Sequence, residues 1–117
     1  MAEHHASCHC GAVQYDVDVA LDKLLTCNCS MCGRSGAIMA FVPREKIKNL
    51  VGEVQLTDYQ FGKKTIHHAF CRTCGAKPLA WGKGEDGSEW AIINVRCFPD
   101  VDVHTLTIAQ QYDGRSR

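Results

Sequence analysis

Short stretches of alternating apolar and polar residues run along the chain. Residues 12–19 alternate with period two, which is the pattern of a strand with one buried face. Further strands are predicted over the short apolar or β-branched stretches 37–42, 54–61, 65–70, 90–96 and 105–109. Helical periodicity is weak everywhere, and residues 44–50, which follow Pro43, are expected to form one or two turns at most. The pattern predicts a mostly β fold of antiparallel strands joined by turns.

The length and composition bound the organisation of the chain. Its 117 residues suit one domain with a modest core, so we expect a single domain over residues 1–117. Residues 1–6 are polar and are predicted to be a flexible tail. No apolar run approaches the ~20 residues that span a bilayer, and the first residues lack the apolar segment of a signal peptide. We therefore expect a cytoplasmic protein with no membrane partner.

The charges are balanced. The chain contains thirteen lysine and arginine residues and thirteen aspartate and glutamate residues, which gives a formal net charge of zero. Proteins that bind nucleic acid usually carry a strong positive field. The composition therefore argues against a nucleic-acid partner.

Cysteines provide the clearest chemical signal. Seven of the eight fall into three clusters, which are Cys8 and Cys10, then Cys27, Cys29 and Cys32, then Cys71 and Cys74. In a reducing compartment such clusters indicate metal binding or catalysis rather than disulfides. Zinc holds thiolates at ~2.3 Å, and ligands one or two residues apart on a tight turn meet this demand. A glycine follows the last cysteine of each cluster, which predicts turns with a positive φ at these glycines.

The spacing allows two arrangements of the ligands. In one, Cys8, Cys10, Cys71 and Cys74 form a closed structural zinc site, while Cys27, Cys29 and Cys32 hold a second zinc ion with one open position, the pattern of a catalytic site. In the other, Cys29 and Cys32 combine with Cys71 and Cys74 in a zinc ribbon, which would be structural or bind nucleic acid. Cys97 stands alone in a predicted strand and is expected to be a small buried residue of the core.

The cysteine motifs and their neighbours carry a family resemblance. The segments are Ser7-Cys8-His9-Cys10-Gly11-Ala12-Val13, Cys27-Asn28-Cys29-Ser30-Met31-Cys32 with Ser35-Gly36-Ala37, Phe70-Cys71-Arg72-Thr73-Cys74-Gly75, Asn94-Val95-Arg96-Cys97-Phe98 and Tyr112-Asp113-Gly114. Together they resemble the glutathione-dependent formaldehyde-activating enzyme (GFA) family, which also includes centromere protein V. The resemblance implies a zinc-bearing β-tent of small antiparallel sheets. It also implies the first arrangement of ligands, with one structural zinc ion and one catalytic or labile zinc ion.

The resemblance also implies a reaction. We expect a carbon–sulfur lyase that joins a small, glutathione-like thiol to formaldehyde or a related aldehyde, or runs the reverse step, with Cys27, Cys29 and Cys32 as the catalytic residues. Arg34 and Lys77 lie close to the clusters in sequence and are candidates to orient a substrate carboxylate. The chain is short beside the glutathione-using members of the family. The resemblance is therefore a better guide to its fold than to its substrate. The alternatives are a non-catalytic zinc module for protein or nucleic-acid interaction, and a zinc buffer.

Overall fold

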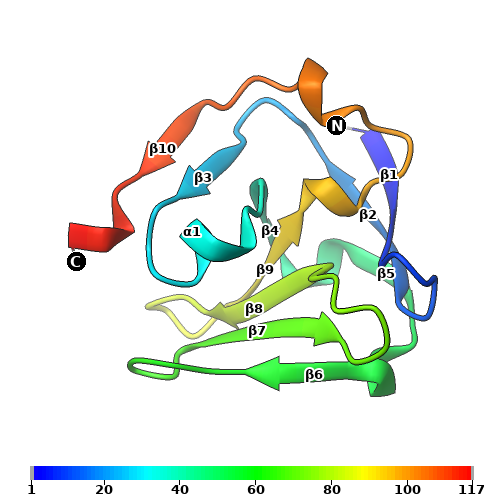
Figure 1. Ribbon diagram of the computed structural model, residues 1–117, viewed down its shortest axis with the longest axis horizontal. Coiled ribbons are helices and arrows are strands. Elements are labelled where there is room, and N and C mark those ends of the chain that lie inside the picture. The colour runs from blue at the N-terminus through cyan, green and yellow to red at the C-terminus, as the bar shows by residue number, and fades with distance from the viewer. Residues whose placement is uncertain (1, 117) are drawn as a thin grey trace.

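Short strands in two sheets form the framework of the computed structural model, which describes residues 2–116 (Figure 1). The smaller sheet has the order β1-β2-β5 and is antiparallel. The larger sheet has the order β10-β3-β4-β9-β8-β7-β6. The strand bounds are β1 Ala2–Ser7, β2 Gln14–Val19, β3 Leu25–Cys27, β4 Met39–Pro43, β5 Ile47–Val51, β6 Leu56–Tyr59, β7 Ile66–Cys71, β8 Leu79–Lys83, β9 Glu89–Asn94 and β10 Gln110–Tyr112.

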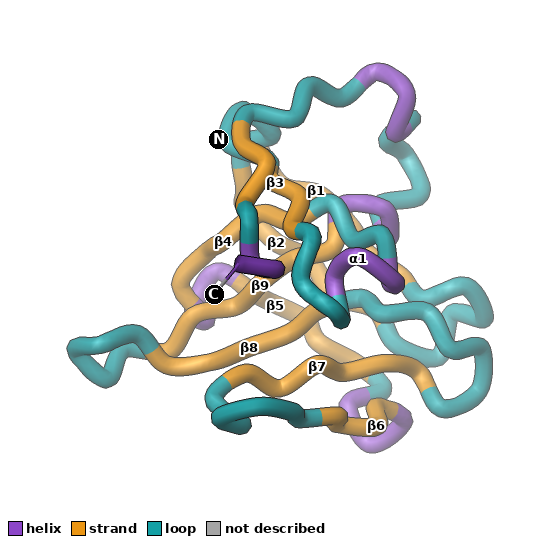
Figure 2. Tube along the Cα trace, turned by 60° about the vertical axis from the view of Figure 1, so that its left-hand side comes forward, coloured by secondary structure: helices purple, strands orange, loops and turns teal. Residues whose placement is uncertain are grey.

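Helical structure is confined to short pieces. The α-helix α1 spans Cys32–Ser35, and the turns Arg44–Lys46, Glu53–Gln55, Val95–Cys97, Val103–Thr105 and Gly114–Ser116 are of the 3₁₀ type. The mostly β fold and its single domain are as predicted, with one exception to antiparallel pairing. β10 runs parallel to β3, which brings the last described residues beside the loop after β3 (Figure 2). No helix within residues 2–116 is long and apolar enough to cross a membrane.

The predicted flexible tail is a strand. Residues 2–6 lie in β1, which pairs with β2 over its whole length, and Met1 lies outside the described residues. Ala6 is fully buried, and the ring of His4 stacks on Phe98 with centroids 5.2 Å apart. His5 lies on the opposite face, with its Nδ1 2.8 Å from Oδ1 of Asp16. The prediction was wrong because polar residues are compatible with an edge strand, and here backbone pairing with β2 orders the segment.

Other strand predictions hold in part. The predicted strands over 12–19, 37–42, 54–61, 65–70 and 90–96 overlap β2, β4, β6, β7 and β9. The predicted strand over 105–109 was wrong, because Leu106 and Ile108 pack against the core outside any sheet and the strand begins at Gln110. Cys97 lies in a 3₁₀ turn rather than a strand and is half-buried. Residues 44–50 form one turn, as expected, and then enter β5.

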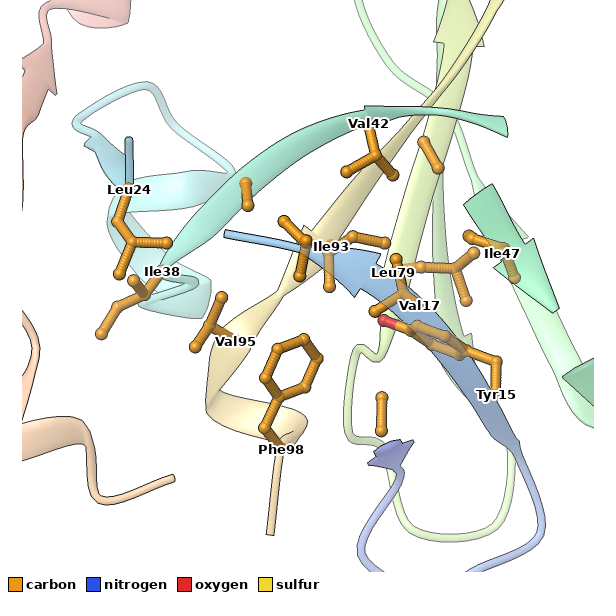
Figure 3. Packing of buried hydrophobic residues seen from close by; sticks show 14 residues of the cluster. Tyr15, Val17, Leu24, Ile38, Val42, Ile47, Leu79, Ile93, Val95 and Phe98 are labelled. Carbon is orange, nitrogen blue, oxygen red and sulfur yellow. The ribbon is translucent and has the colours of Figure 1, made fainter. Parts of the chain in front are cut away.

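The hydrophobic core lies between the two sheets (Figure 3). Alternate residues of the central strands face it, among them Val42 of β4 and Ile93 of β9, and from β2 come Tyr15 and Val17. The Tyr15 hydroxyl donates a hydrogen bond of 2.7 Å to the backbone oxygen of Pro78. Because side chains of a strand alternate between faces, the neighbours of Val42 and Ile93 point to the other face of the larger sheet.

Candidate metal centre and its cavity

Two groups of cysteine thiols gather at separate places in the fold. Within each group all Sγ atoms lie within 4.8 Å of one another. The first group, called the tetrad, consists of Cys8, Cys10, Cys71 and Cys74. The second, called the triad, consists of Cys27, Cys29 and Cys32. This is the first of the two arrangements that the spacing allowed. The zinc ribbon that combined Cys29 and Cys32 with the last pair is not formed.

The tetrad joins two turns that are far apart in the sequence. One turn connects β1 to β2 and the other connects β7 to β8, so the thiols link the smaller sheet to the larger one. Cys10 Sγ lies 3.7 Å from the Sγ of Cys8 and 3.7 Å from that of Cys71. The Val13 amide donates to Cys8 Sγ at 3.3 Å. Backbone amides, that of Ala76 above all, lower the pKa of Cys74 to about 6. Such amides stabilise thiolates.

The glycines after the clusters do not all behave alike. Gly11 and Gly75 have φ values of 82° and 80°, as predicted for these turns. Gly33 instead lies inside α1, and Gly36 takes the positive φ at the end of that helix. The prediction was wrong at Gly33 because the triad loop continues into a helical turn, whereas the tetrad turns return directly to strands.

The triad is built by the end of β3, the loop after it and the start of α1. Amides of this loop donate to its sulfurs, from Cys29 to Cys27 Sγ at 3.4 Å and from Cys32 to Cys29 Sγ at 3.3 Å. All three cysteines are half-buried. Burial raises the pKa of the Cys32 thiol to about 12, so this residue must lose a firmly held proton when it binds a cation.

The C-terminal segment closes one side of the triad. Asn28 joins the loop to this segment, because its Nδ2 donates to Oδ1 of Asp113 at 2.9 Å and its Oδ1 accepts from the Arg115 amide at 2.8 Å. Figure 1 shows this end of the chain beside the loop that follows β3. A Cβ on Gly114 would lie 2.6 Å from Sγ of Cys27, so the backbone passes directly against the thiols. Sequence spacing could not predict this contact, since it joins residues more than eighty positions apart.

A cavity of about 370 Å³ opens beside the triad, on the face of the larger sheet that points away from the core. Its lining residues are Leu25, Cys27, Cys29, Cys32, Ala37, Met39, Phe41, Phe61, Ile66, His68, Lys77, Leu79, Ala80, Ile92, Asn94, Tyr112 and Gly114. The triad therefore borders a space that can admit a small molecule. His68 of β7 also lines this cavity, and no spacing motif marks a single strand histidine as part of a site.

Two basic side chains meet at this cavity. Nζ of Lys77 lies 3.5 Å from Nδ1 of His68, which is buried. Burial, and then the charge of Lys77, lower the pKa of His68. Burial also lowers the pKa of Lys77, while the nearby Cys32 and Cys29 thiols act in the opposite direction. Arg34, the other candidate for binding a carboxylate, instead donates to the backbone oxygen of Ser30 at 2.9 Å.

Comparison with known proteins gives the family. The model of the glutathione-dependent formaldehyde-activating enzyme family matches residues 3–112. The chain belongs to this family. A solved structure of a Rhodobacter sphaeroides protein is similar to this GFA-family chain at 32% sequence identity and a TM-score of 0.78, over 93% of this chain and 98% of that one.

Both cysteine groups of this GFA-family protein suit a soft divalent cation. The donors are sulfur atoms alone, and zinc is commonly held by such sets. Four thiols complete a tetrahedral site, whereas three leave one position for another ligand. The spacing of the thiols and the amides directed at them are therefore compatible with zinc in both places.

Proposed function

We propose that the protein is a zinc-dependent carbon–sulfur lyase of the GFA type. In one direction the sulfur of a small, glutathione-like thiol bonds to the carbon of formaldehyde or a related aldehyde, and the thiol proton moves to the new hydroxyl oxygen. The reverse direction breaks this carbon–sulfur bond. The observation that carries the proposal is the cavity at the triad, because a purely structural zinc module has no need of a space beside its ligands.

The two cysteine groups have different roles in this proposal. The tetrad would hold a structural zinc ion, and Cys27, Cys29 and Cys32 would hold a second one beside the cavity. Bound there, zinc would supply a cation that lowers the pKa of a substrate thiol. We place the activity in the cytoplasm, where thiols stay reduced.

The side chains of the cavity supply binding and proton transfer. His68 faces the cavity with a lowered pKa, so at neutral pH its imidazole is uncharged and can accept the thiol proton. It can then return the proton to the oxygen of the former aldehyde. Lys77 lies beside it and places a positive charge in the cavity that can orient a substrate carboxylate.

The test compares the two cysteine groups in the zinc-loaded protein. Exchange of formaldehyde between free and thiol-bound forms is followed by NMR with glutathione and with simpler thiols. We expect the parent to bind two zinc ions and to accelerate exchange. Cys29→Ser should keep the fold, lose one zinc ion and lose the acceleration.

Cys97→Ser is the matched control, because Cys97 belongs to neither group and a serine hydroxyl can keep the 3.5 Å hydrogen bond that Cys97 Sγ donates to the backbone oxygen of Lys77. It should keep both zinc ions and the acceleration. Equal exchange rates in the parent and in Cys29→Ser would refute a catalytic role of the triad. A parent that does not accelerate exchange with any thiol would refute the proposed function.

A further inference from the structure

The larger sheet is apolar on both faces where its central strands lie. One face of β4 and β9 carries Val42 and Ile93 into the core. The other face carries Phe41 and Ile92 into the cavity beside the triad. A sheet face that is not covered by protein is ordinarily polar. Here Phe41 is 51% exposed, so an apolar surface is kept open at the candidate site.

The rim of the cavity extends this apolar surface. Phe61 and Ile66 line the cavity and are more than a third exposed. A second hollow of about 410 Å³ shares Phe41, Ile66 and Ile92 with the first and continues to Trp90. Lys83 is exposed there and is the one charged residue among those that line the second hollow. A molecule whose sulfur lies at the triad can therefore place an apolar body along this surface.

Charged groups in the cavity beside the triad are few. Lys77 is the one lysine or arginine of its lining, and no aspartate or glutamate is among the described residues that line it. The ammonium of Lys77 forms no ion pair with any carboxylate of residues 2–116. Its backbone is held in place, because its carbonyl accepts hydrogen bonds from Asn94 Nδ2 at 2.9 Å and from Cys97 Sγ at 3.5 Å.

A half-buried ammonium that pairs with no carboxylate is costly, and an anionic ligand would offset part of that cost. Lys77 lines the same cavity as the three cysteines of the triad, so its charge faces the space beside their thiols. Glutathione carries two carboxylates and an ammonium group. The cavity can neutralise one of these carboxylates, but it has no acidic residue for the ammonium.

On the basis of the proposed function, we infer that the thiol substrate has an apolar body and a single carboxylate close to its sulfur, and that Lys77 and Phe41 select it. Lys77 binds the carboxylate. Phe41 and the apolar residues beside it contact the body. Both are specificity-determining residues, and the carbon–sulfur step itself is the one already proposed, in which the thiol proton moves to the oxygen of the aldehyde.

The test uses four thiol probes with the zinc-loaded protein. 2-Mercapto-3-phenylpropanoate has both features, 2-mercapto-3-phenylpropan-1-ol lacks the carboxylate, 2-mercaptopropanoate lacks the ring, and glutathione has the additional charges. Dissociation constants are measured by calorimetry without aldehyde, and exchange with formaldehyde is measured separately. We expect the first probe to bind about tenfold more tightly than each of the others, since it alone combines a charge-assisted contact with burial of a ring.

Two variants assign the selectivity to named residues. Lys77→Met should remove the difference between the acid and the alcohol, and Phe41→Gln should remove most of the difference between the phenyl and methyl probes. Lys48→Met is the matched control, because Lys48 is exposed on β5 in the smaller sheet, and it should bind all four probes as the parent does.

The outcomes separate this inference from the proposed function. If glutathione binds as tightly as the phenyl acid, if no probe binds, or if Lys77→Met weakens the acid and the alcohol equally, the inference is wrong. Turnover of glutathione would then still support the proposed function. If the phenyl acid binds best but no probe exchanges with formaldehyde, the inference holds for binding and the proposed reaction is wrong.

Discussion

Gly114 lies directly against the thiol of Cys27, and a Cβ at this position would approach that sulfur to 2.6 Å and the Cβ of Cys29 to 3.0 Å. The first distance is shorter than any ordinary contact, and the second is at the lower limit. Both atoms belong to short cysteine side chains, which have little freedom to move away. The C-terminal segment therefore shapes the triad from outside the loop that carries its cysteines.

Gly114→Ala should loosen the triad and spare the rest of the fold. The added methyl group displaces Cys27, so we expect zinc affinity at the triad to fall about tenfold or more, the size of effect seen when the surroundings of metal ligands change. Zinc content after dialysis against a mild chelator should fall from two ions to one, with little change in the melting temperature.

Gly33→Ala is the control for this substitution. A Cβ on Gly33 meets only the backbone of Asn28, at 3.5 Å, which is an ordinary contact, and alanine favours the helix there. This variant should retain both zinc ions. Two ions retained in Gly114→Ala as well would show that the C-terminal segment does not restrain the triad.

Cys71→Ser should abolish stable folding. Cys71 is fully buried in the tetrad, which links the turns of the two sheets. Structural zinc contributes about 10 kcal/mol or more to folding in small domains, which is comparable with the whole stability of about 5–15 kcal/mol. We expect no cooperative thermal transition in circular dichroism at neutral pH, whereas Cys29→Ser should retain one. A cooperative transition in Cys71→Ser would mean that the tetrad is not a structural site.

Features of the fold that depend on local sequence patterns could be predicted, and features that depend on distant parts of the chain could not. The cysteine spacing predicted the two pairs and the triad, because ligands two or three residues apart are a local property of the chain. It left open which pairs combine, and the family resemblance implied the grouping that the structure shows. Alternation of apolar residues likewise predicted β2, where each core position is followed by a half-exposed one. It failed for β10, whose pairing with β3 depends on a chain return that no local pattern records.

The cavity could not be predicted for a related reason. Phe41 and Ile92 belong to predicted strands, but an apolar residue in a strand is ordinarily assigned to the core. Only the structure shows that the core lies on the opposite face of β4 and β9, and that Lys77 reaches the same space from the turn before β8. The specificity that we propose for the site thus depends on which face of the larger sheet stays uncovered.

Asp16→Asn should alter how stability depends on pH. Asn49 Nδ2 and His5 hold the pKa of Asp16 below its usual 3.8, and the hydrogen bond with Asp16 raises the pKa of His5 above its usual 6.5. The contribution of Asp16 is present above its unfolded pKa and is lost as the pH falls through the folded value. That of His5 is present below 6.5 and is lost as the pH rises through its raised folded pKa.

Both contributions are therefore present together between about pH 4 and pH 6.5. The difference in urea midpoint between the parent and Asp16→Asn should be largest near pH 5 and should shrink above pH 7. Taking the difference at each pH removes the titration of the cysteines, which both proteins share. A difference that is constant from pH 5 to pH 8 would show that His5 and Asp16 are not coupled.

Tyr15→Phe removes one of the hydrogen bonds that hold the turn carrying Lys77. Tyr15 is fully buried, and burial raises its pKa well above the usual range, so the hydroxyl stays protonated and donates to Pro78. Its loss leaves a buried carbonyl without that donor, which should lower the free energy of unfolding by about 1–2 kcal/mol at constant zinc. Tyr59→Phe, at a side chain that is 48% exposed, should change the free energy of unfolding by less than about 0.5 kcal/mol.

Equal effects of Tyr15→Phe and Tyr59→Phe in urea denaturation would contradict the role assigned to the hydrogen bond between Tyr15 and Pro78. A larger loss in Tyr15→Phe, with weaker binding of carboxylate thiols, would show that the core positions Lys77 as well as stabilising the fold.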